Sequence, residues 1–383
     1  MAGKCPIPLK RLVVYAIILA AIIAALIYAA LSPAIRHGLR PLQKVYDGPS
    51  EGLEETVIVP TLDTPMPPDK NVIWCASFQI AWNEMRDEIV GEPIRIENAE
   101  QIAARLNNAK VTKDDLVPGS YYAKAGAVAD GVIEQIQADM AERLPDVPTP
   151  EIEASPQAVV SYAYLAANVK FTIPFFENEE TFFFDGFPVR SFGIRKKDEH
   201  AHRKLRAQVE VLYSDHDHED GPRGKYEFAL DPCKDSSPSQ IIVACIEAGE
   251  SLAETLAELE RKMANWGGSD WGRKFQENEV LLVPNMSWRL EHHFRGLEGT
   301  DKRILNERSA AAGYYIRVAS QVIEFRLERT GADLKSRADL DAESAEPRYF
   351  LFDRPFLIVM KKRGAERPFF VMWVENAELL CKP

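Results

Sequence analysis

Paired histidines are the side chains in this sequence best suited to do chemistry. His216 and His218 lie two residues apart in the run DHDHED, and Asp220 follows at the same spacing. On a β-strand, residues i and i+2 point to the same face, so these three side chains could bind one metal ion. The run also fits an acidic surface loop that ends at Gly221-Pro222, and we favour that interpretation. A metal-dependent enzyme is therefore only a remote alternative.

No other motif of covalent or acid–base catalysis stands out. The patterns Gly-x-Ser-x-Gly and His-Glu-x-x-His are both absent, and no serine or cysteine lies in a local catalytic signature. A glycine-rich phosphate-binding loop is absent as well. We therefore expect that the protein is not an enzyme and that it uses no cofactor.

Bulk composition excludes one class of partner. The chain has 383 residues, of which 46% are hydrophobic and 27% charged, a balance typical of globular proteins. This length suffices for one large domain or two ordinary ones. The net charge is −12, whereas binding to nucleic acid requires a basic surface. We therefore expect no nucleic-acid partner.

The N-terminal region differs from the rest of the chain. Residues 12–31 read LVVYAIILAAIIAALIYAAL, an uncharged run of the length that crosses a bilayer as a helix. A cleaved signal peptide with Ser32-Pro33-Ala34 as its exit site is the alternative, but its apolar core would be shorter. The sequence thus predicts a membrane anchor in residues 1–33, and a single-pass protein whose large domain lies outside the cytoplasm. Residues 34–68 are rich in proline, which predicts a linker with one short strand, ETVIV.

The cysteines do not indicate a disulfide scaffold. Five cysteines are too few for a secreted domain of this size that is built on disulfides. Cys233 and Cys245 lie in two neighbouring predicted strands, but a turn over residues 234–239 places Cys233 opposite Gln240. We therefore expect free, buried thiols. The five are Cys5, Cys75, Cys233, Cys245 and Cys381.

The spacing of apolar residues predicts helices first and strands later. Helical intervals occur in residues 71–85, 97–109 and 126–144, and a fourth helix is predicted from 156 to about 167. The later runs are rich in β-branched and aromatic residues bounded by turns, which predicts strands. One further helix, over residues 251–265, follows the capping pattern Ser-x-x-Glu. The predicted fold class is α+β, with N-terminal helices packed on large, mostly antiparallel β-sheets.

A long polar segment separates two apolar strands near the C-terminus. Residues 329–347 read RTGADLKSRADLDAESAEP, between YYIRVASQVIEFRL and YFLFDRPFLIVM. Loops of this length are uncommon in compact domains and are usually functional or disordered. Residues 352–358, FDRPFLI, resemble the signature that follows the reactive loop of serpins, the serine protease inhibitor family. Residues 369–376, FFVMWVEN, resemble that family's closing strand.

Further resemblances occur in the same order as in serpins. Residues 71–74, NVIW, resemble the family's Asn-Val-Phe-Ile-Ser-Pro helix entry, although Cys75-Ala76 replaces Ser-Pro. Residues 99–107, AEQIAARLN, are similar to the following helix, and KFTIPF with TFFFDGFPVRSFGI resembles a central stretch of the family. The resemblance covers residues 69–383 and implies a divergent, bacterial-type serpin-like domain with its loop at 329–347.

The resemblance also implies a mechanism for this loop. In inhibitory serpins the target protease cleaves the loop, and the freed segment inserts as a new strand into the main sheet. Polar and apolar residues alternate here, as a half-buried inserted strand requires. However, Leu334 and Leu340 are larger than the residues that the family uses, and overpacking costs about 1–3 kcal/mol for each. The implied hinge has Gly331 at its start, and its inward-facing residues are Ala332, Leu334, Ser336, Ala338 and Leu340.

The size of these leucines decides the preferred function. The sequence favours a membrane-tethered serpin-like protein with a non-inhibitory binding or structural role. The alternative is a serine protease inhibitor that acts by reactive-loop insertion. In that case the resemblance places the scissile bond at Ala345–Glu346, where a small residue suits an elastase-like or subtilisin-like protease. The predicted partners are the membrane, through residues 12–31, and in the alternative a serine protease.

Overall fold

The main sheet of the protein holds five strands, and two of its neighbouring pairs are parallel. The computed structural model describes residues 43–195, 203–216, 226–329 and 347–383. Among these, the first and second strands of the main sheet run parallel, as do the third and fourth, while the other pairs are antiparallel. In spatial order the strands are β1 (Tyr46–Pro49), β14 (Met286–His293), β15 (Tyr315–Leu327), β5 (Ala158–Asn168) and β4 (Tyr121–Ala127).

A second and a third sheet complete the β structure of the described residues, together with one hairpin. The second sheet is antiparallel except at its last pair. In spatial order it contains β10 (Glu210–Ser214), β11 (Phe228–Asp231), β12 (Ser239–Cys245), β17 (Phe356–Lys362), β18 (Pro368–Val374), β3 (Asn71–Cys75) and β2 (Thr56–Ile58). The third sheet contains β16 (Tyr349–Leu351), β13 (Val280–Pro284), β9 (Ser191–Ile194) and β6 (Phe176–Glu177), and the hairpin pairs β7 (Phe182–Phe184) with β8 (Phe187–Val189).

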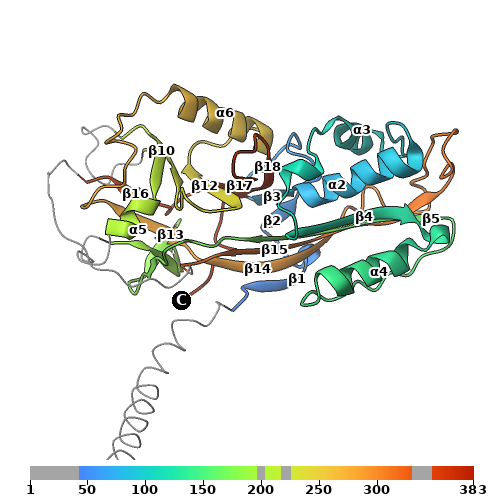
Figure 1. The fold of residues 1–383 in the computed structure, drawn as a ribbon, viewed down its shortest axis with the longest axis horizontal. Helices are drawn as coiled ribbons and strands as arrows, with labels where there is room; N and C mark the ends of the chain where they lie inside the picture. Colours follow the sequence, from blue (N-terminus) through green and yellow to red (C-terminus); the bar gives the residue numbers. More distant parts are fainter. Residues whose placement is uncertain (1–42, 196–202, 217–225, 330–346) are drawn as a thin grey trace, which may run out of the picture. The chain divides into compact units, whose positions relative to one another are not determined.

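The helices cover the sheets from several sides. Figure 1 shows α2 and α4 on opposite sides of β4 and β5, and α6 beside the second sheet. A π-helical turn, Met85–Val90, extends α2, and it ends at Gly91, whose φ of 76° is a conformation that glycine adopts without strain. The α-helices are α2 (Ala76–Glu84), α3 (Glu100–Asn108), α4 (Val132–Arg143), α5 (Arg203–Gln208) and α6 (Leu252–Asn265).

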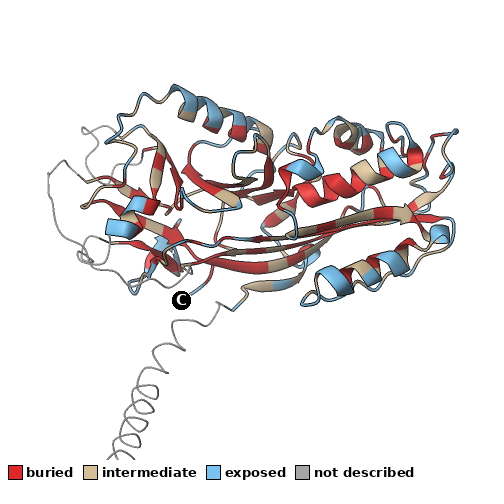
Figure 2. Cartoon of the chain, viewed as in Figure 1, coloured by how far each residue is buried: buried red, intermediate tan, exposed pale blue. Residues whose placement is uncertain are grey.

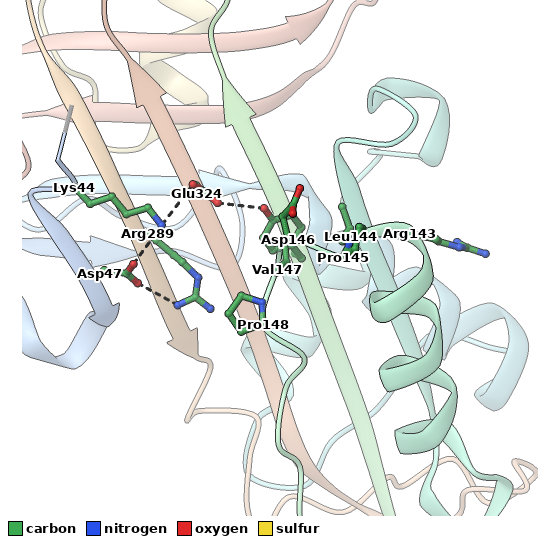
Figure 3. Close-up of a pocket in the computed structure, with 11 residues that line it drawn as sticks. Lys44, Asp47, Arg143, Leu144, Pro145, Asp146, Val147, Pro148, Arg289 and Glu324 are labelled. Carbon is green, nitrogen blue, oxygen red and sulfur yellow. Dashed lines mark hydrogen bonds and ion pairs between the residues drawn. The ribbon is translucent and has the colours of Figure 1, made fainter. Parts of the chain in front are cut away.

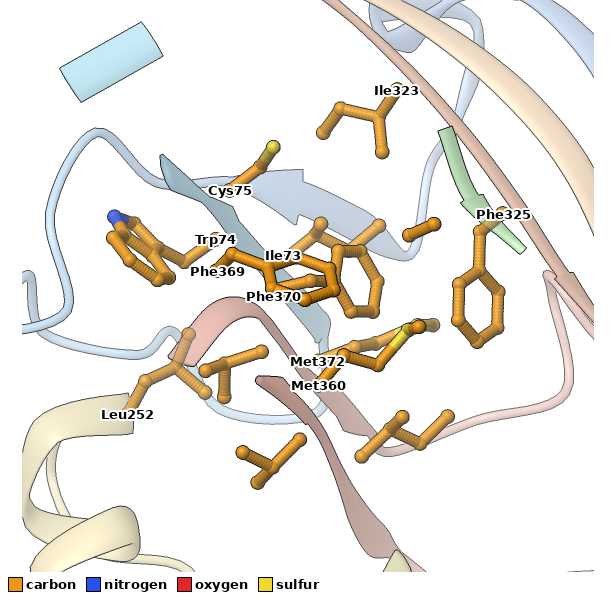
Figure 4. Close-up of a cluster of buried hydrophobic side chains, with 14 of the residues drawn as sticks. Ile73, Trp74, Cys75, Leu252, Ile323, Phe325, Met360, Phe369, Phe370 and Met372 are labelled. Carbon is orange, nitrogen blue, oxygen red and sulfur yellow. The ribbon is translucent and has the colours of Figure 1, made fainter. Parts of the chain in front are cut away.

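The core lies on both faces of the main sheet. The larger apolar cluster fills the space between the main sheet, α2 and the second sheet, and Figure 4 shows part of it. A smaller cluster lies under α4, where Val132, Ile136 and Met140 pack on Tyr162 and Tyr164 of β5. β5 is therefore covered on both faces, and Figure 2 shows it buried along most of its length.

The predicted fold class is confirmed, and two predicted elements need correction. The segment predicted as a helix from 156 to about 167 is the strand β5. Its run of apolar residues is continuous because both faces are buried, and such a run does not by itself distinguish a buried strand from a buried helix. The predicted helix at 71–85 starts only at Ala76, because the preceding residues form β3.

Other elements agree with the sequence. α6 follows Ser251, whose hydroxyl oxygen accepts a hydrogen bond from the Glu254 backbone N–H at 3.2 Å, as the capping pattern predicted. The predicted short strand ETVIV contains β2. Both β1 and β2, which fall within residues 34–68, pair with strands of the large sheets. The described residues from Lys44 onward form one compact unit.

The prediction of a single-pass membrane protein is corrected. None of the helices in the described ranges is long and apolar enough to cross a membrane. The longest of them, α6, has 14 residues, whereas a membrane-spanning helix needs about 20. The predicted transmembrane segment at 12–31, with the extracytoplasmic placement that depended on it, lies outside the described residues.

Candidate functional site

The parallel contact between β5 and β15, here called the junction, forms the middle of the main sheet. Its register runs from Tyr315 opposite Ala158 to Arg326 opposite Asn168. The contact continues past the strand ends, because the Val169 N–H donates to the Arg326 carbonyl oxygen at 3.0 Å. The other neighbour of β15 is β14, which runs antiparallel to it. The junction is thus a closed parallel pair.

Strand direction shows where one further strand would fit. The chain leaves the main sheet after β15, at Arg329, and the next described residue is Pro347. A segment that turns back after β15 runs antiparallel to it. Between β5 and β15, such a strand would be antiparallel to both neighbours, and antiparallel pairs are slightly more stable than parallel ones. The junction is therefore the place in the main sheet that would gain most from an added strand.

A small polar cluster lies on the core side of the junction. Gln321 of β15 donates a hydrogen bond from Nε2 to Ser77 Oγ of α2 at 3.1 Å, and Cys75 Sγ lies 3.2 Å from the same oxygen. Burial raises the pKa of the Cys75 thiol to about 11, so the thiol stays neutral. Ser161 of β5 is also buried, and its hydroxyl has no hydrogen-bond partner among the described residues. Polar groups thus stand here in place of close apolar packing.

On the opposite face, a set of polar contacts lies beside the junction, and one of them crosses it, as Figure 3 shows. The Tyr164 hydroxyl of β5 donates to Glu324 Oε2 of β15 at 3.3 Å, and Lys44 Nζ lies 3.5 Å from Glu324 Oε1. Lys44 also pairs with Asp47 of β1 at 3.2 Å. Neighbouring strands lie about 4.8 Å apart, so a strand inserted between β5 and β15 would double their separation. The Tyr164–Glu324 bridge would then break.

A pocket of about 550 Å³ opens beside this bridge. Its walls come from β1, β14 and β15, from Tyr164 of β5, and from residues 143–148 at the end of α4 and after it. Arg289 of β14 lines it and lies 3.3 Å from Asp47 through Nη1. The segment after α4 thus borders the same face of the sheet on which the bridge lies. An inserted strand would have to pass between this segment and the core.

The end of β15 is fixed where the chain leaves the main sheet. The Phe175 N–H donates to the Arg329 carbonyl oxygen at 3.0 Å, and Arg329 Nε lies 3.8 Å from Glu177 Oε2. Glu177 Oε1 also accepts a hydrogen bond from Arg190 Nη2 at 2.6 Å. These contacts connect the exit of β15 to β6 and to the third sheet.

The chain continues in a different sheet after residue 346. Arg348 forms a buried ion pair with Glu279, and these residues are 8% and 1% exposed. Arg348 Nη1 also donates to the Gly272 carbonyl oxygen at 2.9 Å. The strand that follows, β16, pairs with β13 at the edge of the third sheet. Residues 330–346 therefore connect the middle of one sheet to the edge of another.

Most of the predicted site residues fall outside the described ranges. Of the metal candidates only His216 is described, and its ring contacts Tyr226 edge-on with centroids 4.7 Å apart. Within the described residues, no three His, Cys, Asp or Glu side chains are grouped so that they could hold a metal ion. The predicted residues that lie outside are His218, Asp220, Gly331, Ala332, Leu334, Ser336, Ala338, Leu340, Ala345 and Glu346.

Two neighbouring histidines of β14 have opposite pKa shifts. Burial lowers the pKa of His292 to about 4, and its Nδ1 lies 2.7 Å from Ser50 Oγ. Hydrogen bonds to Glu291 and Glu298 raise the pKa of His293 to about 9, and its Nδ1 lies 2.8 Å from Glu298 Oε1. His292 is therefore neutral and His293 positively charged at pH 7. Elsewhere, the four described cysteines are free and buried, as predicted.

Solved structures that this chain is similar to include several serpins. Uncleaved ovalbumin has a TM-score of 0.48 at 12% identity, with 79% of this chain and 92% of that chain covered. Serpin48 of the insect Tenebrio molitor has a TM-score of 0.45 at 12% identity, with 80% and 92% covered. Native protease nexin-1 with heparin has a TM-score of 0.40 at 13% identity, and the chain spans 66% of its length.

The TM-scores of these three structures lie between 0.40 and 0.48. The sheets and helices of the chain form the α+β fold predicted from the sequence. No family model matches the chain, and no curated protein matches it. At identities of 12–13% the likeness concerns the fold and says nothing about activity.

Proposed function

We propose that the chain inhibits a serine protease by inserting its cleaved loop into the junction. The observation that carries this proposal is the direct parallel pairing of β5 with β15, the strand from which the loop departs. Insertion would replace one parallel pair with two antiparallel pairs. It would also satisfy backbone groups of the loop that otherwise bond to water. In this proposal the loop comprises residues 329–347, and the chain acts as an inhibitor rather than as an enzyme.

The side chains at the junction support insertion. On the core side, β5 presents Ser161, Ala163 and Ala167 beside the larger Leu165, and β15 presents Ala319 beside the larger Ile323 and Phe325. An inserted strand would lie between these residues, and small neighbours leave space for larger side chains on the strand between them. Leu334 and Leu340 would therefore be accommodated at less cost than in a site already filled by large residues.

This reverses the preference drawn from the sequence. A non-inhibitory role was favoured there because Leu334 and Leu340 are large for the hinge of a serpin. The small residues along the junction weaken that objection, and the inhibitory function now explains more of the molecule. The Tyr164–Glu324 bridge across the junction also fits a sheet that must open, because such a contact exchanges readily for contacts with water.

The chemistry of trapping follows from serine protease catalysis. The protease serine would attack the carbonyl carbon of Ala345, and the peptide nitrogen of Glu346 would leave with the proton supplied by the catalytic histidine. The resulting ester joins the protease to the new C-terminus at Ala345. Insertion of residues 332–340 would then pull that ester away from the loop's original position before water could hydrolyse it. In this proposal the hinge begins at Gly331.

A panel of serine proteases tests the proposal. The chain is incubated with elastase-like, subtilisin-like and trypsin-like enzymes, and the products are separated on a denaturing gel. We expect at least one enzyme to give a covalent complex larger than either partner. Cleavage by every enzyme without any complex, and without a rise in the melting temperature of the nicked chain, would refute inhibition by insertion.

A matched pair of loop variants sharpens this test. Ala338→Arg places a charge on the inward face of the inserted strand, and burial of an unpaired charge is strongly unfavourable. We expect this variant to be cleaved as a substrate without forming a complex. Arg337→Ala changes the neighbouring outward-facing residue and should retain complex formation. If both variants form the complex equally, the proposed inward and outward assignment is wrong.

A further inference from the structure

A pocket of about 270 Å³ lies where several segments far apart in sequence meet, and none of its lining residues belongs to the main sheet. One wall is the turn that follows β2, at Leu62 and Asp63, and another is the end of α3 with the residues after it. The first turn of α6 and the start of β18 close the remaining sides. Trp74 of β3 also lines the pocket.

Trp74 has a buried hydrogen-bond donor without an acceptor. The side chain is 2% exposed, and its Nε1 has no hydrogen-bond partner among the described residues. Figure 4 shows this nitrogen on the edge of the ring that points away from Leu252 and the surrounding core. The indole N–H can only donate, and buried donors in proteins nearly always have an acceptor. This nitrogen has almost no accessible surface, so a ligand in the pocket meets the ring of Trp74 and not its N–H.

The charged residues at the pocket favour a ligand with a negative charge. Arg105, Lys110 and Arg367 line it with a single acidic residue, Asp63. Arg367 Nη1 lies 3.8 Å from Asp115 Oδ2, whereas Arg105 and Lys110 form no ion pair within the described part of the chain. Three cations at one small pocket contrast with the net charge of −12 of the whole chain. Cationic groups that lack partners attract anions such as carboxylates.

The remaining walls and the volume restrict the size and character of the ligand. Leu62, Val111, Ala253 and Pro368 supply apolar surface to the pocket. A water molecule occupies about 30 Å³ in the liquid, so a pocket of about 270 Å³ has room for several carbon atoms. Small-molecule sites combine such apolar walls with a few polar groups that fix orientation.

We propose that this pocket binds a small organic monocarboxylate with a short apolar chain. The carboxylate is attracted by Arg105, Lys110 and Arg367. The apolar chain packs against Leu62 and its neighbours. This binding is independent of the proposed protease inhibition, because no lining residue comes from the main sheet or from the loop.

Calorimetric titration of the full chain with butyrate tests this inference, with butyramide as the uncharged ligand of the same size. We expect saturable binding of butyrate, and binding of butyramide at least about tenfold weaker, as the loss of a charged acceptor predicts. Trp74→Phe keeps an aromatic wall and should weaken butyrate binding by less than about threefold. Arg105→Gln should weaken it several-fold, while Arg308→Gln, an exposed change elsewhere, should leave it unchanged.

The use of two pocket variants distinguishes a loss of binding from a loss of folding. Trp74 is buried, so the circular dichroism spectrum and the melting temperature of Trp74→Phe are compared with those of the unchanged protein. Arg105 is partly exposed, so its variant reports on binding even if Trp74→Phe is unstable. The inference is overturned if butyrate does not bind at millimolar concentration. Equal binding of butyrate and butyramide, or binding unaffected by Arg105→Gln, would overturn it as well.

Discussion

The junction and the β17–β18 pair of the second sheet are both buried, but they are built from different side chains. At the junction, β5 and β15 contribute small or polar residues, namely Ser161, Ala163, Ala319 and Gln321, beside the buried Leu165, Ile323 and Phe325, and the Tyr164–Glu324 bridge crosses it on one face. At β17–β18 the strands are antiparallel and present apolar residues that are at most 1% exposed, namely Ile358, Met360, Phe370 and Met372.

This difference indicates which part of the molecule can open. Apolar burial stabilises by about 25 cal/mol for each Å² removed from water, so separating β17 from β18 would lose a large favourable term. Small and polar side chains lose less, because their hydrogen bonds can be replaced by bonds to water or to an added strand. The main sheet can therefore accept a strand at the junction while the second sheet stays fixed.

The largest expected effect is at the second sheet. Phe370 of β18 is fully buried and stacks on Phe325 of β15, with centroids 4.9 Å apart and an interplanar angle of 11°. Phe370→Ala should lower the free energy of unfolding by about 3–5 kcal/mol, measured by urea denaturation. Phe187→Ala is the control, because Phe187 is 59% exposed and its loss should change stability by less than about 0.5 kcal/mol. A cost below about 1 kcal/mol for Phe370→Ala would show that the contact between the second sheet and β15 is not closely packed.

A smaller effect on stability is expected from the titration of His293 in the main sheet. The pKa of His293 is raised to about 9, above its ordinary value of 6.5. Protonated His293 stabilises the folded state through its hydrogen bonds to Glu291 and Glu298. This stabilisation is complete below pH 6.5 and is lost as the pH rises through 9. With allowance for partial exposure, we expect a loss on the order of 2 kcal/mol between pH 6.5 and 9.5.

Unfolding measured across pH checks this expectation with a matched variant. His293→Gln should remove most of the loss on the alkaline side. The pKa of the neighbouring His292 is lowered to about 4, so that residue disfavours folding as the pH falls from 6.5 to 4. The titration of His292 should therefore not affect the free energy of unfolding between pH 6.5 and 9.5. An identical alkaline slope in His293→Gln would mean that other groups cause it.

The smallest expected effect concerns the bridge across the junction. Tyr164→Phe removes the hydroxyl that donates to Glu324 and should lower the free energy of unfolding by about 1 kcal/mol. It should also speed loop insertion after nicking, measured as the rate at which the melting temperature rises. Tyr122→Phe is the matched control, because the Tyr122 hydroxyl donates to Asp139 of α4 at 3.1 Å and does not cross the junction. Equal rates in the two variants would show that the bridge does not restrain opening.

The sequence predicts these two regions unequally. The strands of the second sheet and the helix α6 follow from β-branched runs and from the cap at Ser251. β5 was predicted as a helix because a strand buried on both faces loses the alternation that identifies strands. The position of the loop could be inferred from its length and from the resemblance. The Tyr164–Glu324 bridge could not, because it joins residues 160 positions apart, and no local pattern marks such a contact.

Locking the junction tests the central claim most directly. Ser161 and Ala319 lie directly opposite each other. Neighbouring strands place their Cα atoms about 4.8 Å apart, within the range that a disulfide spans, so Ser161→Cys with Ala319→Cys should join β5 to β15 when oxidised. The control is Ala123→Cys with Ala163→Cys, which would join β4 to β5 and leave the junction free.

The measurement is the melting temperature before and after the loop is nicked, under oxidising and reducing conditions. We expect a large rise after nicking in the unmodified chain, in the β4–β5 control and in the reduced junction variant. The oxidised junction variant should show no rise, because its strands cannot separate. A full rise in the oxidised junction variant would contradict the claim that the cleaved loop enters the main sheet between β5 and β15.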